Sequence, residues 1–295
     1  MKNSTNISSL PIYLISAIYF GCITAVLIYH RSWLALDQFI FFAFIISIFI
    51  GKTKTFLKDW IPFAILFFSY EYLRGLAGIF SNKVNITPMI ILDKIMFGFL
   101  PTIKLQELYY NPNKLQLYDY ISVFLYFSHF VFPPLIAFLF WLKNRVLFKQ
   151  FIYCLLILSY LAFFTYLIYP AMPPWLAAKN NYIPYVHKII HDVFNTLGSS
   201  WNINNMYTYM NPNKVAAMPS LHAAYPFLIF LFFIRLRHLI FQVLSFIYCF
   251  FIWLTLVYLG EHYVIDIIAG IIYATCTYYL FFLVSSIKNN KNKVK

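Results

Sequence analysis

Long apolar runs recur along this 295-residue chain, and they constrain its fold more than any other feature. About 62% of the residues are hydrophobic and only 11% are charged, which is more apolar surface than a water-soluble core can bury. A helix that spans a bilayer needs about 20 mostly apolar residues, and the runs reach that length. They are continuous rather than alternating, which argues against a membrane β-barrel. We therefore expect an all-α fold, a polytopic membrane helical bundle.

Run length and flanking charge predict about eight spans around a six-helix core. Their approximate ranges are 10–30, 33–51, 60–80, 118–141, 149–169, 219–234, 240–259 and 263–284. The apolar stretch 86–103 is broken by Pro88, Gly98 and Pro101, which predicts an interfacial or re-entrant segment. Residues 1–287 are expected to form a single domain whose motifs lie within 60–275. A basic cytoplasmic tail, 288–295, follows and is expected to be disordered.

A formal net charge of +13 would suggest nucleic acid as the partner of a soluble protein. Here the lysines and arginines gather in short clusters between apolar runs, where they indicate topology. The clusters lie at 52–58, 143–149, 235–238 and in the tail. With eight spans and both termini cytoplasmic, all four clusters fall on the cytoplasmic side. The expected partners are the lipid bilayer and membrane lipid substrates, with no nucleic acid, and the oligomeric state stays open.

The same topology brings four ionisable residues to one depth on the non-cytoplasmic side. Arg74 lies toward the outer end of the third span, His222 at the outer start of the sixth, and His262 with Asp266 at the outer start of the eighth. Ionisable groups inside a membrane are costly, and they usually face a cavity or one another. The convergence predicts a functional site there.

The local patterns at these positions suit phosphoryl chemistry. His262 and Asp266 are four residues apart, so on a helix the carboxylate can accept the N–H of the ring and fix its tautomer. The segment MPSLHAAYP places Ser220 and His222 at a helix start, where free backbone N–H groups favour an anion. Arg74 offers a guanidinium fork for phosphate. Together they provide a nucleophile, an acid and a phosphate cradle.

The ordered motifs YEYLRG, YPAMPPW, MPSLHAAYP and GEHYVIDIIAG resemble the type 2 phosphatidate phosphatase and vanadium haloperoxidase superfamily. The form SLH is similar to the inositol phosphorylceramide synthase branch. The resemblance covers roughly residues 60 to 275. It implies that His262 forms a phosphohistidine while Asp266 holds its ring, and that His222 protonates the leaving alkoxide. It further implies that Arg74 and Ser220 hold the phosphate, with no metal and no cofactor.

The chain departs from the phosphatases of this superfamily at two places. Thr255 and Leu256 stand where those enzymes carry Ser-Arg, and Phe67 stands where the lysine of their first motif would be. Both departures fit the synthase-like branch. They leave a phosphate with fewer positive charges, and Lys214 is the expected replacement.

Each candidate also has a structural interpretation. His222 at a helix end could simply face lipid headgroups, and His262 with Asp266 could be a hydrogen-bonded pair that joins helices. Glu71 and Arg74, three residues apart, could form a mutually neutralising ion pair rather than line a substrate path. His129 could line the lipid-entry side or be a hydrogen-bonded core histidine. Asp93 is expected to be structural or interfacial.

The sequence therefore favours a membrane-embedded, metal-independent phosphotransferase that acts on a lipid phosphate. The resemblance implies transfer of a headgroup such as inositol phosphate to a lipid alcohol such as ceramide. If water is the acceptor, the protein is a lipid phosphate phosphatase of the phosphatidate or polyprenyl-phosphate type. The alternative of another class is a non-enzymatic lipid transporter.

Overall fold

The computed structural model describes residues 36–77, 83–196 and 213–293, and this part of the chain is all helical apart from isolated bridges. The expected all-α fold is confirmed for these residues. The helices are α2 (Leu36–Phe49), α3 (Thr53–Ala77), α4 (Thr87–Phe97), α5 (Pro101–Tyr109), α6 (Leu117–Lys143), α7 (Arg145–Ile168), α8 (Pro174–Lys179), α9 (Ile189–Thr196), α11 (Leu221–Arg235), α12 (Leu239–Tyr258) and α13 (Val264–Lys293).

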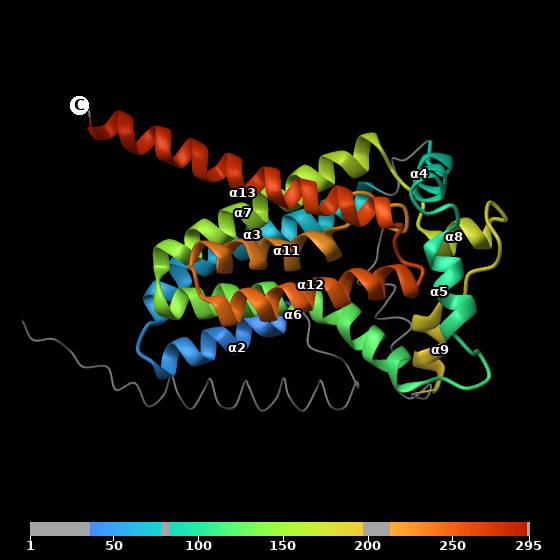
Figure 1. The fold of residues 1–295 in the computed structure, drawn as a ribbon. Coiled ribbons are helices and arrows are strands. Elements are labelled where there is room, and N and C mark those ends of the chain that lie inside the picture. The colour runs from blue at the N-terminus through green and yellow to red at the C-terminus, as the bar shows by residue number, and fades with distance from the viewer. Residues whose placement is uncertain (1–35, 78–82, 197–212, 294–295) are drawn as a thin grey trace, which may run out of the picture.

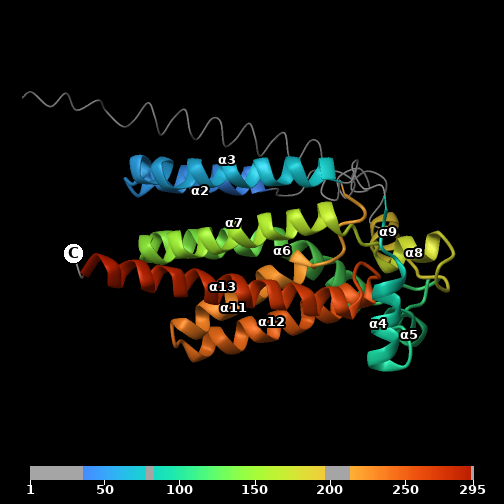
Figure 2. The same ribbon diagram turned by 90° about the horizontal axis from the view of Figure 1, so that it is seen from above.

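The long helices run roughly side by side, and the short helices α4, α5, α8 and α9 gather at one end of the bundle (Figures 1 and 2). The turns from α6 to α7 and from α11 to α12 lie at the opposite end, together with the C-terminal end of α13. The predicted basic clusters at 143–149 and 235–238 thus share one end. The motifs at the starts of α11 and α13 lie toward the other.

Four described helices are long and apolar enough to cross a membrane, namely α6, α7, α12 and α13 up to Ile287. Shorter apolar segments are Phe39–Phe49 in α2 and Leu221–Arg235, the whole of α11. The 25-residue α3 carries charged residues near both of its ends. These seven helices correspond to seven of the predicted spans, while the range 10–30 lies outside the described residues. A multi-pass membrane protein follows, and the number of crossings stays a prediction.

The outer surfaces of these helices support the membrane assignment. Phe246 and Phe250 on α12 and Leu280 and Leu283 on α13 are large apolar side chains, and each is about half exposed. Soluble domains seldom leave such surfaces in water, whereas a bilayer solvates them.

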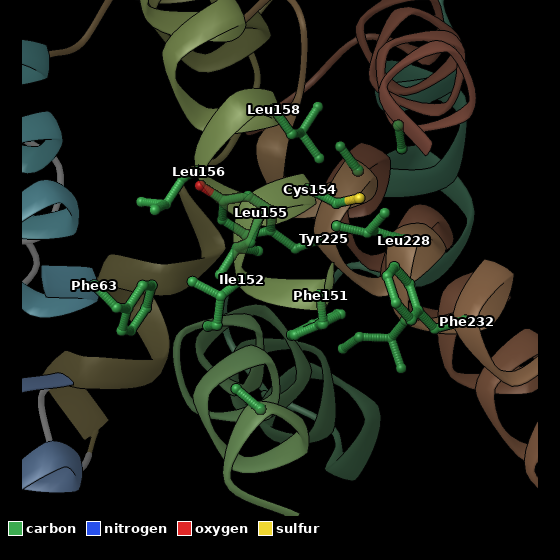
Figure 3. Close-up of a cluster of buried hydrophobic side chains, with 14 of the residues drawn as sticks. Phe63, Phe151, Ile152, Cys154, Leu155, Leu156, Leu158, Tyr225, Leu228 and Phe232 are labelled. Carbon is green, nitrogen blue, oxygen red and sulfur yellow. The ribbon is translucent and has the colours of Figure 1, made fainter. Parts of the chain in front are cut away.

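The centre of the bundle is helix α7, which packs against α3, α6, α11 and α13. Its residues Phe151, Cys154, Leu155 and Leu158 are buried completely or almost completely (Figure 3). Phe232 of α11 closes one side of this cluster through an edge-to-face contact with Phe151. The close packing fixes the axial positions of the helices that carry the polar motifs.

The stretch 86–103 forms α4 and most of α5 rather than a single hairpin. Pro88 and Pro101 each stand in the first turn of a helix, and Gly98 ends α4 with a positive φ of 76°. Both helices lie across the end of the bundle, as an interfacial segment would (Figure 2).

The tail was expected to be disordered, and for the described residues this is wrong. Helix α13 continues through 288–293 to Lys293.

Candidate active site

The two motif histidines meet at the end of the bundle that carries the short helices. His222 lies in the first turn of α11, and His262 stands two residues before α13. The Nε2 atom of His262 is 3.2 Å from the Nδ1 atom of His222. His262 is only 4% exposed. Two imidazoles forty residues apart in the sequence therefore share one enclosed site.

Asp266 is placed differently from the simple helical expectation. Its Oδ2 atom is 3.6 Å from Nδ1 of His262, which is ion-pair distance but beyond a hydrogen bond. The same oxygen instead accepts the backbone N–H of Tyr263 at 2.9 Å. The difference arises because α13 begins at Val264, so His262 stands in the preceding turn and not on the helix. Asp266 is fully buried beside the ring.

Ser220 lies behind the histidines as the N-cap of α11. Its hydroxyl accepts the backbone N–H of Ala223 at 3.3 Å, and its own N–H donates to the carbonyl of Asp266 at 3.0 Å. Ser220 thus joins the two motif segments, and its place in phosphate binding stays a prediction. Gly270 makes this approach possible, because a Cβ there would lie 2.3 Å from the Ser220 carbonyl oxygen.

A cavity of about 330 Å³ opens in front of the histidines. Six of the predicted site residues line it: Glu71, Arg74, His129, Lys214, His222 and His262. Helices α3 and α6 form an apolar part of its wall, with Phe63, Phe67, Phe130 and Pro133. A pocket whose lining combines converging polar groups with apolar side chains suits an amphiphilic ligand.

Arg74 reaches the cavity from the far end of α3. Its Nη2 donates to Oε2 of Glu71 at 2.7 Å, so the predicted ion pair is present. The carbonyl of Arg74 accepts the side-chain N–H of buried Asn213 at 3.2 Å. The neighbouring Lys214 lines the same cavity, and its role as a replacement cation for the phosphate stays a prediction. The pairing of Arg74 with Glu71 and its place on the cavity wall are both observed, so the two interpretations do not exclude each other.

His129 combines its two interpretations as well. Its Nδ1 is 2.5 Å from the carbonyl of Tyr126, and a carbonyl only accepts, so this nitrogen carries the proton. The ring lies against His222 with centroids 3.8 Å apart, and Tyr126 stacks on His222 at 4.7 Å. His129 is thus a hydrogen-bonded core histidine that also lines the cavity and fixes the plane of His222.

The positions where the phosphatases carry additional cations are apolar or turned away from the cavity. Phe67 lies on the cavity wall, where the first-motif lysine was missing. Leu256 is fully buried in the cluster between α12 and its neighbours, and Thr255 is buried beside it. Among the described lining residues, Arg74 and Lys214 carry the positive charge.

Two further residues support the site: Tyr166 was not singled out from the sequence, and Asp93 was expected to be structural or interfacial. Tyr166 of α7 donates its hydroxyl to the carbonyl of Pro219 at 2.8 Å and so holds the turn before Ser220. Asp93 of α4 accepts the backbone N–H groups of Val264 and Ile265, both at 3.0 Å, which caps α13. Burial raises the pKa of Asp93 to about 6. A lone acid followed by an apolar helix gave no sign of a cap 171 residues away.

The motif YPAMPPW ties the loops around the site together. Ala171 donates to the carbonyl of Val215 at 2.7 Å, and Met172 donates to that of Asn85 at 3.0 Å. Trp175 donates its backbone N–H to the carbonyl of Gly260, two residues before His262. The long connection 170–218, to which this motif belongs, is only partly described, because 197–212 lie outside the described residues.

The fold and the cavity define a class of protein, a membrane helical bundle that places two histidines and an arginine on one cavity. Comparison with known proteins assigns the family. The model of the PAP2 superfamily matches residues 106–280, and the chain belongs to this superfamily. It is 27% identical over 227 residues to a phosphoinositol dihydroceramide synthase of Bacteroides thetaiotaomicron, with 72% of each chain covered. No solved structure matches. The predicted type 2 phosphatidate phosphatase superfamily is thereby confirmed.

Proposed function

We propose that this protein is a membrane-embedded phosphotransferase that moves the phospho-headgroup of a donor lipid to a lipid alcohol. The observation that carries the proposal is the placement of His222, His262 and Arg74 on one cavity with apolar walls. The similarity to a phosphoinositol dihydroceramide synthase supports inositol phosphate as the transferred group and a ceramide-type lipid as the acceptor.

In the proposed first step, Nε2 of His262 attacks the phosphorus atom of the donor. The bond from phosphorus to the glycerol oxygen breaks, and His222 gives its proton to that oxygen, so diacylglycerol leaves. Asp266, buried beside Nδ1 of His262, stabilises the positive charge that develops on the ring. Arg74 and Lys214 bind the equatorial oxygens of the phosphoryl group. The 3.2 Å contact between the two rings opens when the phosphate enters.

In the second step, the acceptor hydroxyl attacks the phosphorus atom of the phosphohistidine, and His222 removes the proton of that hydroxyl. The bond from phosphorus to Nε2 of His262 breaks, which releases the product and restores the free histidine. The apolar wall from α3 and α6 admits a lipid acceptor and disfavours water. If water enters instead, the same intermediate gives hydrolysis, which is the outcome expected of a lipid phosphate phosphatase. We infer that the site faces the non-cytoplasmic side, because the basic clusters share the opposite end of the bundle.

The purified protein, incubated with phosphatidylinositol labelled in the inositol ring, tests this proposal. With ceramide present, the label should move to a lipid product, and without ceramide it should be found on the protein. Release of free inositol phosphate at equal rates with and without ceramide would contradict transfer and favour the phosphatase.

His262→Ala should abolish the labelled adduct and reduce turnover by about 10³-fold or more, since it removes the nucleophile. His222→Ala should slow turnover by about 10² to 10⁴-fold, the usual contribution of a general acid. A transporter would retain lipid movement in the His262→Ala variant, and this outcome would exclude the enzyme.

A further inference from the structure

The cavity carries two carboxylates beside the groups that would bind phosphate. Glu71 contacts Arg74 at 2.7 Å, and Glu261 directly precedes His262. Both residues line the cavity, and Glu261 is only 4% exposed. A carboxylate next to a phosphate site repels the anion, so its presence at the cavity requires an explanation.

Apart from the histidines, the described lining residues balance in charge. Arg74 and Lys214 are positive, and Glu71 and Glu261 are negative. Lys188 lies outside the cavity wall, over the ring of Trp175 at 3.4 Å, and its electrostatic interaction with Glu261 offsets part of the charge of that carboxylate. The charged residues of the wall itself supply little net positive potential to a bound anion.

This balance discriminates between two kinds of lipid phosphate. A phosphomonoester carries a charge of about −1.5 to −2 at neutral pH, because its second pKa is about 6. A phosphodiester carries a single charge at any pH near neutrality. The additional charge of the monoester would be bound between two carboxylates and only two cations.

The cavity volume also favours a phosphodiester lipid with a headgroup over a phosphomonoester. At about 330 Å³ it lies at the lower end of the range for small-molecule sites, about 300 to 1,000 Å³, and it is far larger than a phosphate ion. A headgroup attached to the phosphate can therefore occupy it. An ionised carboxylate only accepts hydrogen bonds and has about four lone-pair sites, so a cation on one side leaves sites for hydroxyl donors.

We propose that Glu71 and Glu261 determine donor specificity: they accept hydrogen bonds from the hydroxyls of a neutral polyol headgroup on a phosphodiester lipid, and they repel phosphomonoesters. This inference rests on the proposed function and assigns its donor class. The two acids exclude phosphatidate by charge and recognise a hydroxyl-bearing headgroup by hydrogen bonding, which a specific site achieves by combining attraction and repulsion.

The test compares two donors with the full-length protein in detergent micelles. The kcat/KM values for phosphatidylinositol and for phosphatidate are measured for the wild type, Glu71→Gln, Glu261→Gln and the double variant. Glu107→Gln is the control, because Glu107 is an exposed acid on α5 that pairs with Lys104 and does not line the cavity. Each glutamine variant should shift the ratio about tenfold toward phosphatidate, and the control should leave it unchanged.

Orthovanadate, a phosphate mimic, supplies a second readout that does not require turnover. Its Kd should fall in both glutamine variants and stay constant in Glu107→Gln. A donor ratio that remains at the wild-type value in both variants overturns the inference. Equal loss of both activities with unchanged vanadate binding overturns it as well. A wild type inactive on both donors contradicts the proposed function instead, so the two failures are distinguishable.

Discussion

At the scale of single residues, the site depends on backbone contacts as much as on the polar side chains. Asp266 binds the Tyr263 N–H through its carboxylate and the Ser220 N–H through its carbonyl. The starts of α11 and α13 are therefore joined next to both histidines. This contact tolerates no side chain at position 270, where the sequence has glycine.

Gly270→Ala should separate the two motif segments. Its Cβ would lie 2.3 Å from the carbonyl oxygen of Ser220, and neither atom belongs to a flexible side chain. Overpacking of this kind costs about 1–3 kcal/mol, so we expect a lower thermal midpoint and a large loss of kcat. Thermal unfolding in detergent and the headgroup-transfer assay measure the two effects.

Cys276→Ala is the matched control for this prediction, because Cys276 is an exposed small residue on the same helix. It should leave both quantities close to wild type. A Gly270→Ala protein with wild-type stability and activity would show that the two helix starts do not need this close approach.

At the scale of elements, the short helices at the end of the bundle position the start of α13. Asp93 of α4 accepts two N–H groups there, and Gln106 of α5 binds the carbonyls of Tyr258 and His187. The groups that the Asp93 and Gln106 side chains bind are main-chain N–H and carbonyl groups of segments that flank the site. Helices α4 and α5 thus act as a brace, although they contribute no residue to the cavity wall.

Asp93→Ala should loosen this brace. Loss of a helix cap costs about 0.5–2 kcal/mol, and the two N–H groups of α13 would lose their acceptor. We expect a lower thermal midpoint and a kcat reduced more than KM is raised, because His262 precedes α13 by two residues. Asp93→Asn, which keeps one acceptor oxygen, should recover part of the activity, and equal loss in both variants would contradict a capping role.

The pH dependence of stability gives Asp93 a separate signature. Burial raises its pKa from 3.8 to about 6, so between these values the folded protein holds more protons than the unfolded chain. Stability should therefore decrease as the pH rises from about 4 to about 6. Asp93→Asn removes the titrating group and should flatten this part of the profile, measured as thermal midpoint against pH. An identical slope in both proteins would assign the effect to another group.

At the scale of the whole molecule, the basic clusters and the candidate active site lie toward opposite ends of the bundle. The basic turns lie at one end of the bundle, and helices α4 and α5 lie at the other end with the starts of α11 and α13 (Figure 1). Helix α11 has 15 residues, about 22 Å, which is shorter than a hydrocarbon core of about 30 Å. Its first turn, which carries His222, is therefore expected to lie below the outer headgroups, within reach of a lipid phosphate.

This polarity predicts which sites a membrane-impermeant thiol reagent can label. Lys114→Cys lies in the connection between α5 and α6 at the site end, and Arg237→Cys lies in the turn between α11 and α12 at the basic end. In sealed vesicles with the cytoplasmic side inward, the reagent should label the first and not the second. The reverse pattern in inverted vesicles is the control, and equal labelling of both positions in either preparation would contradict the topology.

The apolar periods and the charge clusters predicted the helices closely, because helix formation in a membrane depends on local composition. The predicted span 118–141 corresponds to the observed helix Leu117–Lys143, and the predicted span 240–259 corresponds to Leu239–Tyr258. The motif residues were found in the same way, since His222, His262 and Arg74 stand out as ionisable groups in apolar runs. The interfacial stretch 86–103 was predicted from its prolines and glycine, whereas the helical end of the tail was not, because that helix continues beyond the apolar run.

The sequence alone thus determined the membrane class, the helices and the candidate catalytic and binding residues, since these follow from composition and short-range spacing. Only the tertiary structure decided their partners. Asp266 binds Tyr263 rather than the His262 ring, Ser220 caps α11, Asp93 caps α13, and Glu261 shares the cavity with Arg74. The hydrogen bonds among these join segments up to 171 residues apart, and their distances depend on how closely the helices pack, which no local pattern encodes.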